Sequence, residues 1–586
     1  MTHKVALISM PWARPDYTSI QVGRLMAYLK QNGIHCTAFY PYLELSNTLG
    51  YDLYYIIADL LHPIIAEGFF ANMPGSDNEI KFITECVESG ELNTQQIIDV
   101  LKTCNSFIEN LSRQDIWGNF SYVGFSCTFN QVLSSIALAR QLKLRYPWQK
   151  IIFGGGNMSG LAGQKYLEMY DFIDCVISGP GEEALLQYLT NDIQDKVFIE
   201  GSFIPANLSI LPDYDDFYYS PHLTTQNASA ILTASDGCDY GGCAFCILNE
   251  RKIYNQLSKE EIIEMILKTI KLYGTKYIEF ADTSLPPCIT SSEFSSQIEM
   301  LGLHMYGEMR ASLDNQKAIN LKMAGFDGLQ IGIESFSTNV LRRMRKPSNA
   351  LQNIYNLRIL YENEIEAIYN LILDFPGTEA EELNSVIELI PSIFHIAPPK
   401  ALIKFQLCRG SAVFENKDKY MIDKIMPSHL YMESLGGESE KIFPSYFDYS
   451  YKGKDLSQWF QRIDSLCRKW VDSYNPVMST LSLKQNNGKS IISDSRIGTV
   501  IHYSLAPAEI ACINACDEPA MAEDIYRDFG KTVVNYLLNK KILLYENGEI
   551  LSLPVNEKRR NLPPPQPLDS YFCEDVMPKY KDIKRR

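Results

Sequence analysis

The sequence predicts an α/β protein that is built from more than one domain. Two stretches of the chain, residues 1–215 and 225–425, each alternate short apolar strands with amphipathic helices, which is typical of parallel sheets covered by helices. The chain has 586 residues, too many for one ordinary domain, and this length suggests three or four domains. An apolar fraction of 46% and a charged fraction of 21% are normal for a folded protein, so disorder over most of the chain is excluded.

The first alternation predicts a doubly wound, Rossmann-like domain over residues 1–215, with a helical insert at about Asp52–Asn110. Glycines 154–156, 179 and 181 come directly after two of its strands. Because such sheets bind ligands beyond the carboxyl ends of their strands, these glycines mark the expected ligand site. The predicted strands are Val5–Met10, His35–Tyr40, Tyr122–Cys127, Lys150–Phe153 and Phe172–Ser178, and the predicted helices are Ile20–Asn32, Gln131–Leu144 and Ala184–Thr190.

The second alternation predicts a partial, open barrel of six parallel strands over residues 225–425, because it holds six strand–helix units where a full barrel has eight. Its clearest helix is Ser258–Tyr273, in which Ser258 and Glu261 form a capping box and Gly274 closes the end. The six predicted strands are Ala230–Ala234, Tyr277–Asp282, His304–Met309, Gly328–Glu334, Glu366–Asp374 and Ala401–Leu407.

Residues 426–586 predict a small, mostly helical C-terminal domain. Two helices, Ala506–Ala515 and Met521–Leu538, precede a hairpin whose turn is Asn547-Gly548. Helix, helix and hairpin are the content of a winged-helix-like unit, which we place at about residues 505–555. The proline-rich stretch Pro563–Pro567 predicts a stiff, linker-like tail.

Charge and hydropathy limit the partners that the chain can have. The formal net charge of −16 argues against a protein held on nucleic acid by phosphate contacts, which needs a basic face. No stretch approaches 18 uninterrupted apolar residues, so no transmembrane helix is expected. The apolar run Val5–Met10 is too short for a signal peptide. Eleven of the fourteen cysteines are scattered along the chain, which fits a reducing compartment. We therefore expect a cytoplasmic protein with no nucleic-acid partner and no membrane.

Three cysteines lie close together in the segment that follows the first barrel strand. Cys238, Cys243 and Cys246 stand on a glycine-containing loop at the carboxyl end of that strand, where barrel active sites form. Three thiolates suit an iron–sulfur cluster in which one iron keeps an open coordination position. Structural zinc is the main competitor, but it wants four protein ligands, and neither His222 nor Cys288 has the paired spacing. Buried cysteines of a core loop are the third interpretation.

The loop has the spacing C-x4-C-x2-C, with Phe245 directly before its last cysteine. At the head of a six-unit barrel, this arrangement resembles the radical S-adenosylmethionine (radical SAM) superfamily, whose usual spacing is C-x3-C-x2-C. The resemblance implies that the three cysteines hold a [4Fe-4S] cluster. It also implies that SAM chelates the free iron and is cleaved to a 5′-deoxyadenosyl radical.

Polar residues stand at the ends of the later barrel strands, as a SAM site at the barrel top requires. Glu308 and Arg310 are two residues apart, which places both on one face of a strand. Glu334 ranks highest, because Gly332 lets a ligand approach the backbone closely. The resemblance implies SAM contacts from Phe245, Asp282, Glu308, Arg310, Glu334 and Ser335, and the candidate catalytic residues near the substrate are Tyr306 and Arg409.

A Rossmann-like domain ahead of such a barrel resembles the cobalamin-dependent radical SAM enzymes. Taken alone, its glycine loops support a generic nucleotide site equally well, whereas nicotinamide is disfavoured because no G-x-G-x-x-G follows the first strand. None of the eight histidines has an aspartate two residues before it, so no histidine is expected below the cobalt. The cobalamin contacts that the resemblance implies are Ser126, Thr128, Gln131, Gly155, Gly156, Asn157, Gly179 and Glu182.

Nearly the whole chain resembles one branch of these enzymes, the radical SAM C-methyltransferase-like maturases of ribosomally made peptides. The resemblance rests on Ser9–Trp12, Gly68–Ala71, Gly332–Ser335 and Arg409–Ser411. The branch has a longer cysteine loop, and its Gly-Glu-Gly-Glu stands here as Gly179-Pro180-Gly181-Glu182.

This resemblance implies methylation of an unactivated carbon in a peptide or small natural-product precursor, with electrons from an external donor such as a flavodoxin or ferredoxin. Two alternatives stay open. One keeps the cofactors but performs cyclisation or epimerisation. The other is a non-catalytic zinc- or cobalamin-binding module that binds a partner through its C-terminal unit.

Overall fold

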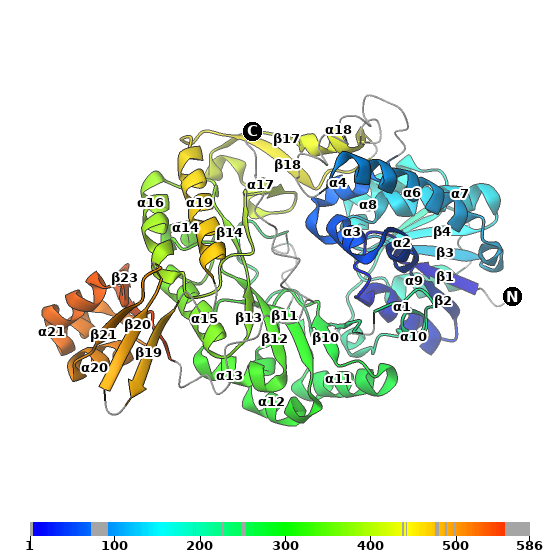
Figure 1. Cartoon of the computed structure of the whole chain (residues 1–586). Coiled ribbons are helices and arrows are strands. Elements are labelled where there is room, and N and C mark those ends of the chain that lie inside the picture. Colours follow the sequence, from blue (N-terminus) through cyan, green and yellow to red (C-terminus); the bar gives the residue numbers. More distant parts are fainter. Residues whose placement is uncertain are drawn as a thin grey trace.

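Figure 1 shows the computed structural model of the chain, in which the N-terminal domain, the barrel and the C-terminal elements follow one another along the sequence. The structure describes residues 4–556 apart from 72–81, 83–91, 192, 194, 226, 248–253, 436–438, 441, 475–479, 487–488 and 497. The predicted proline-rich tail lies outside the described residues. No helix in the described part is long and apolar enough to cross a bilayer.

The N-terminal domain contains a six-stranded parallel sheet with the order β2-β1-β3-β4-β5-β6. Five strands were predicted, and the sixth, β6, was not. The order reverses between β1 and β3, which is the point where doubly wound sheets bind ligands. The strands are β1 (Lys4–Ile8), β2 (His35–Phe39), β3 (Tyr122–Ser126), β4 (Lys150–Gly154), β5 (Cys175–Ser178) and β6 (Val197–Glu200), and the helices that follow them include α1 (Ile20–Gln31), α7 (Val132–Arg145), α8 (Leu161–Met169) and α9 (Glu182–Thr190).

The helical insert lies between β2 and β3, as predicted. It packs on the loop after β1 through Trp12, whose ring contacts Tyr54, Phe69 and Phe70 and whose indole N–H donates to Ala66 O at 2.8 Å. These contacts fix the loop that runs from the sheet toward the barrel. The described elements of the insert are α2 (Pro41–Leu49), α3 (Tyr51–Tyr55), a π-helical turn (Ile56–Leu60), α4 (Pro63–Gly68) and α6 (Thr94–Ser112).

The second unit is an open barrel of six parallel strands, and the predicted α/β fold class is confirmed. Strands β7, β10, β11, β12 and β13 form one sheet, and β14 pairs with β15. The predicted fifth strand is divided into β13 and β14, and a bridge between Glu334 and Leu371 joins β14 to the end of β12. The bounds are β7 (Ala230–Leu232), β10 (Tyr277–Phe280), β11 (His304–Arg310), β12 (Phe326–Gly332), β13 (Glu366–Ile368), β14 (Asn370–Ile372) and β15 (Ala401–Ile403).

Helices cover the outside of the barrel. The predicted capping box is present in α11, where Ser258 accepts from Glu261 N and Glu261 accepts from Ser258 N, and Gly274 ends the helix in the left-handed conformation. The outer helices are α11 (Lys259–Tyr273), α12 (Ser292–Ile298), α13 (Asn315–Ala324), α14 (Thr338–Arg343), α15 (Ala350–Glu362) and α16 (Ala380–Leu389).

The N-terminal domain covers the open side of the barrel, between the outer strands β7 and β15. On the β7 side, Thr18 N donates to Ser229 O at 3.2 Å and Ser229 N to Asp16 O at 2.8 Å, so that the loop before α1 continues the sheet. On the β15 side, Gln406 contacts the ring nitrogen of His62 at 2.7 Å. These contacts hold the two domains together on both sides of the gap.

The chain after the barrel first crosses back to the N-terminal domain. A three-stranded antiparallel sheet of β16 (Leu407–Cys408), β18 (Tyr446–Tyr451) and β17 (Ile422–Pro427) leads to α18 (His429–Leu435), which packs on α4. Figure 1 shows this yellow segment as an arch between the barrel and the blue insert. The sequence did not predict the sheet.

The C-terminal unit, at the left of Figure 1, contains the predicted helices and hairpin. Helix α21 breaks at Gly530, where φ is 76° and ψ is 155°. A second, four-stranded sheet of β19 (Leu481–Asn486), β20 (Lys489–Asp494), β21 (Ile501–Ser504) and β25 (Val555–Asn556) was not predicted. The winged-helix-like elements are α20 (Pro507–Ala515), β22 (Ala520–Met521), α21 (Ala522–Asn539), β23 (Leu543–Glu546) and β24 (Glu549–Ser552).

A buried arginine of α15 anchors this unit to the barrel. Arg358 is 1% exposed and donates to Ser552 O at 2.7 Å and to the Asp517 carboxylate at 2.9 Å. Because the guanidinium is out of water, its partners must supply all of its hydrogen bonds. We expect Arg358→Ala to lower the free energy of unfolding by about 3 kcal/mol, measured by urea denaturation.

The exposed Arg527, which pairs with Asp524 on the surface of α21, supplies the control. Arg527→Ala should leave the urea midpoint unchanged, because exposed ion pairs contribute little. Equal midpoints for the two variants would contradict the assignment of Arg358 as an anchor.

Candidate functional site

The three cysteines lie on the loop that follows β7 and the short strand β8 (Ser235–Asp236). Each is half-buried, and none of the cysteines in the described residues forms a disulfide. Burial raises the pKa of Cys243 to about 11, against the opposing effect of the Lys346 ammonium. Among the described residues no three His, Cys, Asp or Glu side chains are gathered at metal-ligand spacing.

The start of the cysteine loop is fixed by residues at the end of β10. Asp282 is buried and accepts hydrogen bonds from Ala234 N, at 2.9 and 3.1 Å, and from the Ser235 hydroxyl. Burial raises the pKa of Asp282 to about 6. Thr283 Oγ1 donates to Gly237 O at 2.8 Å. Asp282 therefore orients the loop, and its predicted contact with SAM stays a prediction.

The middle of the loop is fixed by the end of α14. Ala244 N donates to Met344 O at 2.8 Å, and the Tyr240 hydroxyl donates to Arg345 O at 2.6 Å. The carbonyl of Ala244 in turn accepts from Val413 N at 3.1 Å. The loop thus lies between the barrel helix and the arch, and Phe245 packs in the apolar cluster between them.

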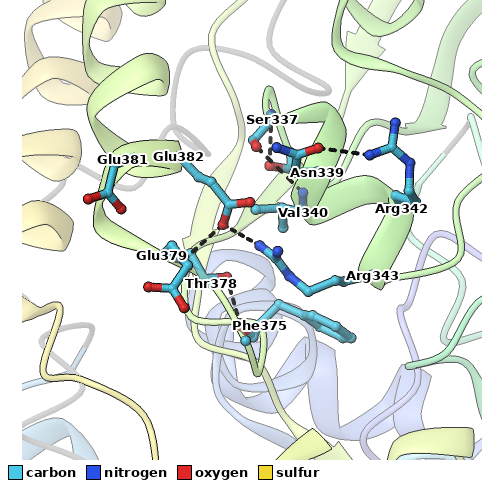
Figure 2. A network of polar contacts seen from close by, with 12 residues as sticks. Ser337, Asn339, Val340, Arg342, Arg343, Phe375, Thr378, Glu379, Glu381 and Glu382 are labelled. Atoms are coloured by element: carbon cyan, nitrogen blue, oxygen red, sulfur yellow. Dashed lines mark hydrogen bonds and ion pairs between the residues drawn. The ribbon is translucent and has the colours of Figure 1, made fainter. Parts of the chain in front are cut away.

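Helix α14 is itself tied to α16, as Figure 2 shows. Arg343 forms an ion pair with Glu382, which also accepts from Glu379 N at 2.8 Å and so closes the capping box of α16. At the start of α14, the Ser337 hydroxyl caps Val340 N. This network gives the carbonyls that hold the cysteine loop a fixed support.

The predicted polar residues at the ends of β11 and β12 surround the loop. Arg310 forms a two-pronged ion pair with Asp239, which is itself a residue of the cysteine loop. Glu334 pairs with Lys346 at 3.3 Å and has a φ of 59°, a conformation that non-glycine residues rarely adopt. Burial and the neighbouring Glu334 raise the pKa of Glu308.

Two neighbouring positions act differently from the sequence-based expectation. A Cβ at Gly332 would lie 2.6 Å from the Lys346 ammonium, so this lysine fills the space that was expected for a ligand. Ser335 is buried, and its hydroxyl accepts from Ser337 N at 3.1 Å. The structure therefore brings the predicted strand-end residues together, while their roles in binding SAM stay predictions.

Tyr306 lies deeper in the barrel, on β11 opposite Glu279 of β10. Its hydroxyl is 3.4 Å from Gln330 Oε1. Burial raises the pKa of Glu279 to about 7, against the opposing effect of a hydrogen bond from Tyr17. Tyr17 comes from the N-terminal loop, so the barrel interior includes a residue of the other domain that the sequence analysis missed.

A cavity of about 1130 Å³ lies between the N-terminal domain and the barrel. Its walls come from the carboxyl edge of the six-stranded sheet, from α4, from the start of the cysteine loop at Asp236, and from the arch. The volume exceeds the usual range of small-ligand pockets and suits a large cofactor. The predicted residues that line it are Ser126, Thr128, Gly155, Gly156, Asn157, Gly179, Glu182 and Arg409.

Gln131 does not line the cavity. Its buried amide accepts from Thr128 Oγ1 at 2.7 Å and donates to Met10 O at 2.6 Å, so it positions the loop that carries Thr128. Gly155 has a φ of 97°, and a Cβ there would collide with the carbonyl of Cys127. A Cβ at Gly156 would meet open space, so Gly156 leaves room for a ligand.

Two charged residues at the cavity wall, Glu182 and Arg409, already have partners within the chain. Glu182, at the start of α9, is buried and pairs with Arg24 of α1 at 2.9 Å. Arg409 donates to Pro444 O at 3.0 Å, and its guanidinium lies 4.4 Å from the Phe443 ring centre. Arg409 thus lies in the arch at the cavity, whereas Tyr306 lies in the barrel.

Two further residues were not predicted. Cys408 lines the cavity, and burial together with the nearby Cys246 raises its pKa to about 11. Glu67 of α4 also lines the cavity and accepts from Val132 N and Leu133 N at 2.7 Å, which caps α7 from another element. Neither pairing has a local sequence signal, because the partners are far apart along the chain.

Comparison with known proteins identifies the barrel. Residues 232–390 match the profile of the Radical SAM superfamily. This segment is a radical SAM domain. The resemblance to this superfamily, which the cysteine loop indicates, is therefore confirmed.

The chain beyond this domain also resembles a solved structure. Its fold matches that of TsrM from Kitasatospora setae, a radical S-adenosylmethionine methyltransferase determined with cobalamin and a [4Fe-4S] cluster bound. The TM-score is 0.52 at 11% sequence identity, and the match covers 80% of this chain and 91% of TsrM. The predicted arrangement of a Rossmann-like domain before a radical SAM barrel is thus confirmed as a fold.

Two curated relatives carry methyltransferase names. An uncharacterized methyltransferase of Pyrococcus horikoshii is 21% identical over 420 residues, which are 66% of this chain and 88% of that protein. The bacteriochlorophyllide d C-12(1)-methyltransferase of Chlorobaculum tepidum is 22% identical over 360 residues, 57% of this chain and 75% of that protein.

His62, which contacts Gln406 between the two domains, should make the stability of the protein depend on pH. Burial and the neighbouring His429 lower the pKa of His62 to about 4. Between pH 6.5 and 4 the unfolded chain therefore takes up a proton that the folded chain does not, and stability falls as the pH falls. His62 Nδ1 also caps Ile64 N at 3.2 Å, a role that asparagine can take over.

We expect His62→Asn to lose less stability than the wild type when the pH is lowered from 6.5 to 4. The measurement is the urea midpoint of both proteins at steps of pH through this range. Parallel pH profiles would contradict the assignment.

Proposed function

We propose that the chain is a cobalamin-dependent radical SAM methyltransferase that methylates an unactivated carbon of a peptide or small natural-product precursor. The observation that carries the proposal is the position of the large cavity. It joins the carboxyl edge of the Rossmann-like sheet to the start of the cysteine loop. A bulky cofactor bound in this cavity would lie beside the cysteine loop, and TsrM, which shares the fold, was determined with cobalamin and a [4Fe-4S] cluster bound.

The donor atoms fit the proposed cofactors. Cys238, Cys243 and Cys246 are half-buried cysteines outside any disulfide, and they lie on one loop that hydrogen bonds hold in place. Three thiols suit a [4Fe-4S] cluster with one open iron. The cavity edge offers Ser126, open space at Gly156 and an apolar floor of sheet residues. When bound, the cluster and SAM supply a carbon-centred radical, and cobalamin supplies the methyl group.

The residues of the chain position these groups and exclude water. The carbonyls at the end of α14 keep the cysteine loop at the barrel top, and Arg310 holds Asp239 of the same loop. Glu308 and Glu334 lie beside the loop as the candidate partners of SAM. The arch contributes Arg409 and Phe443, which contact each other, to the wall of the cavity.

Zinc is the competing occupant of the cysteine loop. Cys246 lies close enough to Cys408 to raise the pKa of the Cys408 thiol, and four thiols would also suit a structural zinc ion. Iron and sulfide analysis separates the two. Purified without oxygen, the proposed enzyme contains about four iron and four sulfide per chain, whereas one zinc without sulfide would refute it.

The proposed reaction is tested with the protein reconstituted with iron, sulfide, cobalamin and SAM and reduced by flavodoxin, ferredoxin or a chemical donor. We expect 5′-deoxyadenosine, and a precursor encoded beside the gene should gain the mass of one CH₂. Loss of two hydrogens would instead indicate cyclisation, and an unchanged mass with altered stereochemistry would indicate epimerisation. No 5′-deoxyadenosine from the cluster-loaded protein would contradict a radical mechanism.

Cys243→Ala should remove the cluster. With two thiols left, we expect iron to fall from about four to near zero per chain and 5′-deoxyadenosine formation to be lost. Cys288→Ala is the matched control, because Cys288 is a half-buried thiol of the same domain outside the loop. Full iron content in Cys243→Ala, or equal loss in both variants, would contradict the assignment.

A further inference from the structure

A basic stretch forms the end of α14 and the turn that follows it. Four of the five residues 342–346 are arginine or lysine, and no acidic residue stands between Glu334 and Glu362, although the whole chain has a net charge of −16. The dipole of a helix favours cations in its last turn, but α14 has only six residues and Arg345 lies beyond its end. The stretch is therefore a local excess of positive charge on an acidic protein.

Among the described residues, two of these four cations have no ion-pair partner. Arg343 and Lys346 form the ion pairs described above. Arg342 and Arg345 are exposed, and neither pairs with a carboxylate in this part of the chain. Arg342 donates to the side-chain oxygen of Asn339 at 2.8 Å, and Figure 2 shows it extending away from the network around Arg343. Both charges are therefore available to a partner.

The same stretch is bonded directly to the cysteine loop. The carbonyl of Arg345 accepts from the Tyr240 hydroxyl at 2.6 Å, and that of Met344 accepts from Ala244 N at 2.8 Å. Tyr240 stands two residues after Cys238, and 38% of its surface is exposed. Tyr240, Arg342 and Arg345 together form what we call the basic surface, which borders the loop that carries the three cysteines.

The basic surface lies outside the large cavity. The cysteine loop contributes Asp236 and the exposed Ile247 to the described cavity wall, whereas Tyr240, Arg342 and Arg345 are not among the lining residues described there. The loop therefore has a cavity side, which faces the proposed cofactor and substrate, and an outer side. A protein partner that approaches the outer side comes close to the cysteines without entering the cavity.

The composition of the basic surface is typical of a protein interface. Tyrosine and arginine are enriched among the residues that contribute most to binding between proteins. Complementary charge mainly raises the association rate and selects the partner. Because most of this protein is acidic, an acidic partner is repelled elsewhere and attracted here. Reductive cleavage of SAM consumes one electron from outside, so a partner at this place is suited to supply it.

We infer that Tyr240, Arg342 and Arg345 form the docking surface of an acidic electron-transfer protein, which delivers its electron to the iron–sulfur cluster on the cysteine loop. This inference rests on the proposed function. In the transfer the donor is oxidised by one electron and the cluster is reduced by one electron. No covalent bond forms between the two proteins.

The inference is tested by reversing the two charges and measuring electron transfer itself. Full-length protein loaded with iron and sulfide is mixed without oxygen with reduced flavodoxin, an acidic donor, and cluster reduction is followed by stopped-flow absorbance. At low ionic strength we expect the second-order rate constant of Arg342→Glu/Arg345→Glu to be at least about tenfold below that of the wild type. The difference should shrink as salt is added, because salt screens exposed charges.

Lys102→Glu/Arg145→Glu is the matched control, because it changes the net charge by the same amount. Both residues are exposed, on α6 and at the end of α7, and Figure 1 places these helices far from α14. The control should react at nearly the wild-type rate. Equal rates in the wild type and Arg342→Glu/Arg345→Glu, or equal losses in the two double variants, would overturn the inference.

A charge-conserving variant separates docking from a structural role. Arg342→Lys/Arg345→Lys keeps both charges and should stay within about threefold of the wild-type rate constant, whereas a loss as large as that of the glutamate variant would overturn the inference. Dithionite, which needs no docking surface, should reduce the cluster to the same extent in every variant. A wild type that assembles no cluster would instead refute the proposed function.

Discussion

Two backbone carbonyls at the end of α14, those of Met344 and Arg345, hold the loop on which the three cysteines stand. Much of the structure can be understood as support for this contact. The Arg343–Glu382 ion pair fixes the helix laterally to α16. At its other end, Thr338 donates to Glu546 of the C-terminal hairpin at 2.6 Å. A loop rich in glycine has high conformational entropy, so its order depends on rigid partners outside it.

A second constraint is the incomplete barrel. Six strands leave a gap between β7 and β15, and the polar edge of β7 would otherwise be open to solvent. The loop of Asp16 and Thr18 continues the sheet at this edge and brings Tyr17 to Glu279 inside the barrel. The same arrangement turns the carboxyl edge of the first sheet toward the cysteine loop. The same packing of the two domains therefore both covers the open edge of the barrel and forms the cavity.

The parts of this architecture that the sequence predicts are those with local signals. Hydrophobic periodicity and the Ser258–Glu261 capping box are read within one turn or one strand, and they predicted both alternations and α11. The cysteine loop was recognisable from spacing alone. The sheets β16–β18 and β19–β21 escaped prediction, because their strands are short and partly exposed, and such strands are defined by pairing rather than by periodicity.

In the candidate site, too, the sequence predicts where residues lie better than it predicts what they bind. Residue type and strand position predicted that Asp282 and Arg310 would lie at the barrel top, and both do, but the structure shows each bonded to the cysteine loop or its entry. Sequence alone cannot separate a carboxylate that binds a ligand from one that orients a loop. Cys408 and Tyr17 were missed because each approaches the site from an element far away in the sequence.

The packing of the C-terminal unit against the barrel limits which class of partner this unit can bind. In winged helices that bind DNA, the helix after the turn enters the major groove. Here the hairpin instead faces the barrel, with Glu546 at Thr338, Glu549 bonded to Asn349 at 2.8 Å, and Ser552 O bonded to the buried Arg358. Because the hairpin is part of the support of α14, a partner that displaced it would also disturb the cysteine loop. The unit therefore belongs to the catalytic body, and any substrate that it holds must bind on the surfaces that this packing leaves exposed.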